Sequence, residues 1–287
     1  NTAAMPGQIT HINEDVLAFY RNLPFNYYSE PRVAAESLRG SNPIVNYPDL
    51  VDVLKKGKSV LDVGCGAGWL VNAINHYFGS YGTRAEGLDA NPVALEQAAA
   101  VATILDSESK FLEKDLFLYE PARPYDLVIS LGVLHHTNNC IEAVRHICKR
   151  FVAPGGDFYL GLYHKYGRKP FLDHFAKLKE SGALEEELRE EFRRLLPHNT
   201  DETHFMSWFR DQVLHPHETQ HSVEEINTVL EDEGMRLVST SINKFAPIDT
   251  LAAIFEQEKD YLGLGEKRLR EGTYFPGFFV VFAHKPS

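Results

Sequence analysis

Cysteine is scarce in this chain of 287 residues, which contains only three. Cys65, Cys140 and Cys148 are scattered, and no two of them form a C-x-x-C pair. This small, odd set excludes a disulfide framework and a zinc knuckle. It is typical of a reducing compartment, so we expect a cytoplasmic protein.

Long apolar runs and basic clusters are also missing. No stretch approaches the roughly 20 apolar residues of a membrane-spanning helix, so we expect no membrane partner. Residues Asn1 to Thr10 are polar and lack the charged-then-apolar pattern of a signal peptide. The formal net charge is -11, whereas a protein that binds duplex nucleic acid carries a basic face. We therefore expect a small-molecule partner and no nucleic acid, and the oligomeric state stays open.

The most informative segment runs from Val60 to Leu70. An apolar run that contains Asp62 leads into three alternating glycines, and a helical pattern then starts at Trp69. The glycines are Gly64, Gly66 and Gly68. A buried strand, a tight turn and a helix N-terminus together form a site for a nucleotide-type cofactor. A dinucleotide fingerprint needs a small residue where Trp69 stands, so a smaller nucleoside ligand is favoured over a nicotinamide dinucleotide.

Strand-like and helix-like segments alternate along most of the chain. Strands are predicted at 60–63, 85–89, 110–112, 125–130, 157–163, 235–242 and 277–283. Helices are predicted at 92–101, 138–151, 222–233 and 248–270. This alternation predicts an α/β fold with a doubly wound, mostly parallel sheet.

The alternation is interrupted between residues 165 and 220, where the sequence is mostly helical. An apolar stripe surrounded by charged residues predicts amphipathic helices there: Leu184, Leu188, Phe192 and Leu195. Ahead of the first strand, a helical pattern from Asn13 ends in an aromatic cluster at residues 25–28. We therefore expect a helical lid segment at 1–57, a cofactor-binding domain at 58–164 and 221–287, and a helical cap insertion at 165–220.

Polar residues follow the predicted strands at the edge where parallel sheets bind ligands, beyond the carboxyl ends. Asp89 ends the second strand, about 25 residues after the glycines, where a carboxylate suits hydrogen bonds to both ribose hydroxyls. Asp115 follows the third strand, where it can accept from an exocyclic adenine amine. The alternative readings are that Asp89 only caps the next helix and that Asp115 is a plain turn residue.

Five segments in the matching order resemble those of class I S-adenosylmethionine-dependent methyltransferases, nearest the branch of quinone-biosynthesis and other small-molecule enzymes. They are VLDVGCGAGWL, GLDANPVALEQA, EKDLF, YDLVISLGVLHHT and VAPGG. The likeness covers residues 58–163 and is weaker at 222–245 and 277–285. It implies a Rossmann-like seven-stranded sheet with an antiparallel last strand, S-adenosyl-L-methionine as cofactor, and methyl transfer to a small-molecule acceptor.

The resemblance also implies a role for each matched position. The glycines let the backbone approach the methionine part of the cofactor, Asp62 fixes the loop and the amino group, and Asp89 binds the ribose. Asp115 and Leu116 frame the adenine, and Leu131 offers its backbone. The expected cofactor-binding residues are Asp62, Gly64, Cys65, Gly66, Gly68, Asp89, Ala90, Asn91, Asp115, Leu116 and Leu131.

Four aromatic side chains are expected near the transferred methyl group. Tyr27 and Tyr28 match no motif; they either pack in the core or close over the sulfonium as a lid, since a cation binds to an aromatic face. His135 and His136 lie just past the fourth strand. Either is a candidate catalytic base because histidine titrates near neutrality, and His136 is the stronger candidate of the two. The alternative is that they cap the next helix or hydrogen-bond within the fold.

The insertion carries a second histidine group. His215, His217 and His221 form an H-x-H-x3-H pattern that could hold a metal ion. Pro216 keeps the first two from sharing a regular helix, so we favour a structural or acceptor-binding loop and expect no metal. In relatives this segment forms a cap over the acceptor. The expected acceptor-binding residues are therefore Tyr163, His164, Tyr166, Arg168, Trp208 and Arg210.

Two other functions remain open beside methyl transfer to a small molecule. One is an enzyme that uses the same cofactor to transfer another group. The other is a non-catalytic module that binds S-adenosylmethionine and acts through partners. Formation of S-adenosylhomocysteine separates the enzyme from the binding module.

Overall fold

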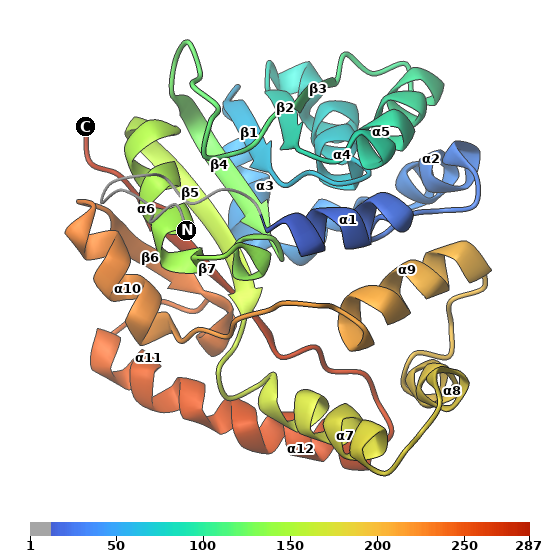
Figure 1. Ribbon diagram of the computed structural model, residues 1–287. Helices are drawn as coiled ribbons and strands as arrows, with labels where there is room; N and C mark the ends of the chain where they lie inside the picture. Colours follow the sequence, from blue (N-terminus) through green and yellow to red (C-terminus); the bar gives the residue numbers. More distant parts are fainter. Residues whose placement is uncertain (1–12) are drawn as a thin grey trace, which may run out of the picture.

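The computed structural model describes residues 13–287, so the polar stretch Asn1 to Thr10 lies outside the described residues. A seven-stranded sheet crosses the molecule, with helices on both faces (Figure 1). The strands are β1 (Ser59–Val63), β2 (Arg84–Asp89), β3 (Lys110–Glu113), β4 (Tyr125–Leu131), β5 (Val152–Tyr163), β6 (Arg236–Thr240) and β7 (Phe278–His284). Their order is β3-β2-β1-β4-β5-β7-β6, and β7 runs antiparallel to β5 and β6. The predicted doubly wound α/β sheet with an antiparallel last strand is confirmed.

The helices alternate with the strands except in the insertion. They are α1 (Glu14–Asn22), α2 (Pro31–Gly40), α3 (Pro48–Leu54), α4 (Trp69–Phe78), α5 (Pro92–Ile104), α6 (Cys140–Arg150), α7 (Lys169–Glu180), α8 (Glu185–Leu195), α9 (Glu202–Val213), α10 (Val223–Asp232), α11 (Leu251–Gln257) and α12 (Tyr261–Arg270). Side chains of Asn91, Asp201 and Ser222 accept backbone N–H groups and so begin α5, α9 and α10.

Two predicted helices are shorter in the structure. The first ends at Asn22, because Leu23 precedes Pro24 and is therefore extended. The helix predicted at 248–270 splits into α11 and α12 at a 3-10 turn that begins with Glu258. Glu258 is buried and accepts from Nε2 of His164 and from the N–H of Val223, both at 2.7 Å. The interruption thus coincides with this buried, hydrogen-bonded carboxylate.

Each face of the sheet has its own apolar core. Helices α6, α10 and α11 cover one face, with Ile147 and Ile226 buried between them and the strands. Helices α2 to α5 cover the other, where Leu70 and Val71 are buried. Burial of each such side chain contributes roughly 1.5–3 kcal/mol. These two layers fix the strands whose carboxyl ends carry the candidate site.

The insertion folds around a third core. Phe171, Phe192 and Phe209 of α7, α8 and α9 pack there together with Leu269 of α12 and Tyr274. The predicted apolar stripe is buried apart from Leu184, which is 70% exposed because it precedes α8. The cap is therefore built from the insertion and from part of the C-terminal segment.

Residues 13–30 of the expected lid segment lie along α9 of the cap. Tyr20 donates its hydroxyl to Asp211, and the ring of Tyr28 stacks on His204 with centroids 4.1 Å apart. The hydroxyl of Ser29 donates to Asp201 at 2.6 Å. The first and the middle parts of the chain thus meet at one edge of the sheet (Figure 1).

Candidate functional site

The turn between β1 and α4 is held by hydrogen bonds to β2. The N–H groups of Gly64 and Cys65 donate to the carbonyl of Leu88 at 2.7 and 3.1 Å. The N–H of Gly66 donates to Oδ2 of Asp89 at 2.8 Å. The end of β2 therefore fixes the glycine loop and places the expected ribose-binding carboxylate beside it.

The three glycines all have positive φ angles, which side chains rarely adopt: 76° for Gly64, 52° for Gly66 and 78° for Gly68. A Cβ on Gly64 would lie 2.3 Å from Val133, and one on Gly68 would lie 2.6 Å from Ala98. A Cβ on Gly66 would meet no atom within 4 Å. The outer two glycines thus permit close packing, while Gly66 faces open space that a ligand can approach.

Two carboxylates flank this loop. Asp62 is 4% exposed, and its burial together with nearby Asp89 raises its pKa to about 8. A cationic amino group bound there would favour the ionised form of Asp62. The side chain of Cys65, in contrast, packs against Gly87, where an added Cβ would lie 2.6 Å from its sulfur. Only the backbone of Cys65 can therefore face a ligand.

Asp89 is also bound by the residues that follow it. The N–H of Asn91 donates to its Oδ1 at 2.8 Å, while the side chain of Asn91 caps α5 and donates to the carbonyl of Tyr20 at 2.9 Å. Burial raises the pKa of Asp89, and the N–H groups of Asn91, Gly66 and Ala90 oppose that rise. Ala90 and Asn91 thus hold the carboxylate and tie the lid segment to the cofactor loop.

The ends of β3 and β4 complete the edge of the sheet. Asp115 follows β3, and its Oδ1 accepts from the N–H of Phe117 at 2.8 Å, which forms a turn. The side chain of Leu116 is buried in the core. Leu131 is the last residue of β4 and lies beside Gly161 of β5. Asp115, Leu116 and Leu131 thus lie near the carboxyl ends of β3 and β4, as predicted. The adenine contacts of Asp115 and Leu116 and the backbone contact of Leu131 stay predictions.

The two lid tyrosines connect α5 to the cap. The N–H of Tyr28 donates to Oε1 of Gln97 at 3.1 Å, and Nε2 of Gln97 donates back to the carbonyl of Tyr28 at 3.0 Å. The N–H of Tyr27 donates to the hydroxyl of Ser207 at 3.3 Å. Because the ring of Tyr28 stacks on His204, it packs against the cap. Cover over a sulfonium by either tyrosine stays a prediction.

His135 and His136 differ in which ring nitrogen is occupied. Both are buried in a 3-10 turn after β4. Nδ1 of His135 accepts from the N–H of Tyr163 at 3.1 Å, and its ring stacks on that of Tyr163. Nδ1 of His136 donates to the carbonyl of His217 at 2.9 Å, since a carbonyl can only accept. Burial lowers the pKa of both histidines, so His136 is neutral with its lone pair on Nε2.

Asp211 of α9 faces that lone pair. Its Oδ1 lies 3.9 Å from Nε2 of His136. The carboxylate accepts from the hydroxyls of Tyr20 and Tyr163 and, at 2.6 Å, from Nε2 of Gln212. Burial raises the pKa of Asp211. Lid, strand β5 and cap thus converge on His136.

Arg168 is a buried structural link. Its guanidinium donates to both carboxylate oxygens of Glu218, to the side chain and the carbonyl of Gln212, and to the carbonyl of Pro276. It also lies 3.9 Å above the ring of Tyr163. Because all of its N–H groups donate within the protein, Arg168 joins β5, the cap and the C-terminal segment.

The other expected acceptor residues divide between the core and the lid. His164 is fully buried against Glu258, and the N–H of Tyr166 donates to its Nδ1 at 3.2 Å. Trp208 and Arg210 lie on α9 and face the lid: their side chains contact residues 19–26. Trp208 and Arg210 remain proposed acceptor-site residues through the closure of that lid, and Tyr166 is partly exposed beside His164.

The three histidines of the H-x-H-x3-H pattern have separate partners. His221 contacts Thr219 and Glu225 through its two ring nitrogens at 2.7 and 3.1 Å. Nε2 of His217 donates to a backbone carbonyl at 3.1 Å. Among residues 13–287, His215 instead forms a possible metal-binding group with His136 and Asp211. The potential ligand atoms of these three residues lie within 4.8 Å of one another.

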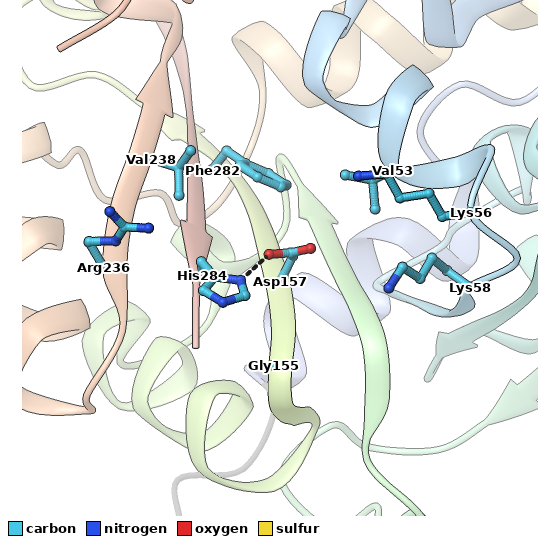
Figure 2. A pocket seen from close by; sticks show the side chains of 9 residues that line it. All are labelled: Val53, Lys56, Lys58, Gly155, Asp157, Arg236, Val238, Phe282 and His284. Atoms are coloured by element: carbon cyan, nitrogen blue, oxygen red, sulfur yellow. Dashed lines mark hydrogen bonds and ion pairs between the residues drawn. The ribbon is translucent and has the colours of Figure 1, made fainter. Parts of the chain in front are cut away.

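A hollow of about 410 Å³ lies at the opposite edge of the sheet. Figure 2 shows Lys56 and Lys58 on one side of it, and Asp157, Arg236 and His284 on the other. Asp157 and His284 pair at 2.8 Å. The hollow lies near the starts of β1 and β6, away from the glycine loop at the end of β1, so it is not part of this site. Among the helices of the described chain, none has the length and apolarity needed to cross a membrane.

The sheet order and the glycine loop together define the fold of the class I S-adenosylmethionine-dependent methyltransferases. A family model described as a methyltransferase domain matches residues 44–240. The chain therefore belongs to the methyltransferase domain family, and the family resemblance seen in the sequence is confirmed.

Three similar proteins illustrate this membership. A ubiquinone biosynthesis O-methyltransferase from Pseudomonas entomophila is 30% identical over 131 residues, 45% of this chain and 54% of that protein. A tRNA U34 carboxymethyltransferase from Hydrogenovibrio crunogenus is 31% identical over 113 residues, 37% of this chain and 32% of that protein. A solved S-adenosylmethionine-dependent methyltransferase from Mesorhizobium loti has a TM-score of 0.51 and 20% identity, with 86% of this chain and all of that one covered. The chain spans about half or less of the length of these curated relatives.

Proposed function

We propose that the protein transfers a methyl group from S-adenosyl-L-methionine to a small-molecule acceptor. The observation that carries the proposal is the contact between the glycine loop and the turn that holds His136. Gly64 packs against Val133, three residues before His136, so the open glycine loop adjoins the buried histidine. A group bound at the loop and an acceptor beneath the cap would meet there.

The residues at the loop suit each part of the cofactor. The N-terminus of α4 favours a carboxylate, Asp62 favours an ammonium group, and Asp89 can accept from ribose hydroxyls. Asp115 and Leu116 would frame the adenine, and Leu131 would offer its backbone. When bound, the cofactor supplies a methyl group on positively charged sulfur.

His136 is the proposed residue that activates the acceptor. The lone pair on its Nε2 can take a proton from an acceptor hydroxyl or N–H group. His135 is the weaker candidate, since its Nδ1 is occupied by the N–H of Tyr163. Burial beneath the lid and cap excludes water, which favours transfer to the acceptor over side reactions.

Burial is also what supports a small acceptor. His136 and Asp211 are each 5% exposed, so a large polymer has little access to them. The net charge of -11 disfavours nucleic acid, and the similar ubiquinone biosynthesis enzyme is an O-methyltransferase by name. The similar carboxymethyltransferase keeps transfer of another group as the second candidate.

The test incubates the purified protein with methyl-labelled S-adenosylmethionine and a metabolite extract. We expect S-adenosylhomocysteine and a labelled product from the wild type, and neither from Asp89→Ala. Binding of the cofactor without either product indicates the non-catalytic module. Mass spectrometry of the product distinguishes a methyl from a carboxymethyl group.

A further inference from the structure

We propose that His136, Asp211 and His215 bind a divalent transition-metal ion beside the acceptor site. Their potential ligand atoms lie within 4.8 Å of one another, although His136 lies in the turn after β4, Asp211 in α9, and His215 just beyond the end of α9. The binding of the ion does not depend on the proposed function. Its consequence for the acceptor rests on that function.

The first reason is that His136 and Asp211 face each other without a hydrogen bond between them. Nδ1 of His136 carries the ring proton, so Nε2 presents a lone pair to the carboxylate at 3.9 Å. This distance is too long for a hydrogen bond. Within residues 13–287, Nε2 of His136 has no hydrogen-bond partner, although the residue is only 5% exposed. A cation between the lone pair and the carboxylate would satisfy both.

The second reason is the position of His215. Its ring stacks on that of His136 with centroids 3.7 Å apart. In the described part of the chain its Nε2 is also buried without a hydrogen-bond partner. Nε2 of His136 and Nε2 of His215 thus both lack a partner, and each of these residues has a ring nitrogen within 4.8 Å of the Asp211 carboxylate. Two imidazoles and one carboxylate suit zinc and iron(II), and three protein ligands leave positions open for substrate.

The groups around the ligands are arranged as in metal centres. A metal-bound histidine commonly donates its other ring N–H to a carbonyl, as His136 does to His217, and a ligating carboxylate is held by hydrogen bonds. Tyr20 and Gln212 hold Asp211 in this way. Nδ1 of His215 accepts the N–H of His217 at 3.0 Å. Ligation through Nε2 puts the proton on Nδ1, so His215 releases that N–H when the ion binds.

The ion would change how the acceptor is activated. One lone pair cannot hold both a proton and a metal ion, so the ion would replace His136 as the activating group. A divalent ion lowers the pKa of a hydroxyl that it contacts. The acceptor O–H bond would then break as the acceptor binds the ion, and its proton would pass to bulk solvent before the site closes. The O–CH3 bond would form as the S–CH3 bond breaks, which leaves S-adenosylhomocysteine. This favours an acceptor with a hydroxyl group.

The test measures metal binding directly. Wild-type protein is stripped with a chelator, dialysed, and titrated with Zn²⁺ by calorimetry and with Co²⁺ by visible absorption. We expect saturation at one ion per chain and a Co²⁺ spectrum of low coordination number. His136→Gln, Asp211→Asn and His215→Gln should each weaken Zn²⁺ binding by roughly 10–100-fold or more.

Matched controls are His217→Gln and His221→Gln, which alter the histidine pattern of the sequence but keep the three ligands. They should keep the wild-type stoichiometry. His215 is the least buried of the three ligands, so its variant should fold as judged by circular dichroism. No saturable binding in the wild type, or binding that persists in a folded His215→Gln protein, overturns the metal site.

This outcome is separable from failure of the proposed function. Asp89→Ala should lose S-adenosylmethionine while it keeps Zn²⁺. A protein that binds Zn²⁺ but forms no S-adenosylhomocysteine retains the metal site and loses the methyl-transfer proposal. Methyl transfer that survives chelation, with no metal bound, returns the activating role to His136 alone.

Discussion

The backbone N–H of Gly66 donates to Oδ2 of Asp89 at 2.8 Å, so one carboxylate holds the glycine loop and also faces the expected ribose site. The loop and the end of β2 are therefore one unit. A change at Asp89 should loosen the loop as well as remove a ligand contact.

Asp89→Ala should weaken S-adenosylmethionine binding at least about tenfold. Loss of charge-assisted hydrogen bonds costs on the order of 1.5–3 kcal/mol. Isothermal titration checks this, with Glu96→Ala as the control because Glu96 is exposed on α5. Unchanged affinity in folded Asp89→Ala would remove Asp89 from the site.

Gly66→Ala and Gly68→Ala should fail in different ways. Both place a side chain at positive φ, which costs roughly 1–2 kcal/mol. Only Gly68→Ala also forces a Cβ to 2.6 Å from Ala98, and such overpacking costs a further 1–3 kcal/mol or so. In urea denaturation Gly68→Ala should therefore be the less stable, while Gly66→Ala folds and loses cofactor affinity. Equal stability of the two would contradict this assignment.

Asp62 should make the ligand-free protein less stable as pH rises. Its folded pKa of about 8 lies above the ordinary value, so between about pH 4 and 8 the folded state holds a proton that the unfolded state releases. Its contribution to the free energy of unfolding therefore falls across that window, by up to about 1.4 kcal/mol per pH unit. Urea denaturation of wild type and Asp62→Asn from pH 5 to 8 measures the difference. Parallel curves would show that Asp62 does not titrate there.

Trp208→Ala and Arg210→Ala should disturb acceptor use and spare cofactor affinity. Both side chains join α9 to the lid segment, since Arg210 donates to the carbonyl of Phe19 and Trp208 packs against Phe25. The KM for the acceptor should rise, and the lid should be cleaved faster in limited proteolysis. Calorimetry should find wild-type affinity for S-adenosylmethionine. Glu190→Ala is the control, because Glu190 is exposed on α8. Loss of cofactor binding in a folded variant, with acceptor affinity intact, would reverse the assignment.

His136→Gln and His135→Gln should separate catalysis from structure. His136→Gln removes the Nε2 lone pair that activates the acceptor, so turnover should fall by a factor of roughly 10²–10⁴, with little change in cofactor affinity. His135→Gln should mainly lower the free energy of unfolding, because Nδ1 of His135 satisfies the buried N–H of Tyr163. Single-turnover methyl transfer at saturating cofactor compares them. Near-wild-type turnover in His136→Gln would show that neither proton nor metal is held there.

The sequence by itself determined the cofactor half of the protein. Glycines at alternate positions, Asp62 before them and Asp89 at the next strand end are local signals, since each strand, turn and helix is specified by neighbouring residues. The order of such units then fixes a parallel sheet and its ligand edge. The antiparallel β7 followed from the family resemblance and not from any local pattern.

Only the tertiary structure decided the acceptor half. Asp211 and Tyr20 are 191 residues apart in the chain, and no local pattern joins them. The spacing in the sequence placed His215, His217 and His221 in one pattern, but in the structure His215 stacks on His136, while His217 and His221 have other partners. The guanidinium of Arg168 is buried and must pair, and Glu218 and Gln212 satisfy it, so its acceptor contact stays a prediction. Such pairings depend on side chains that meet only after the cap has folded, so spacing along the chain carries no signal for them.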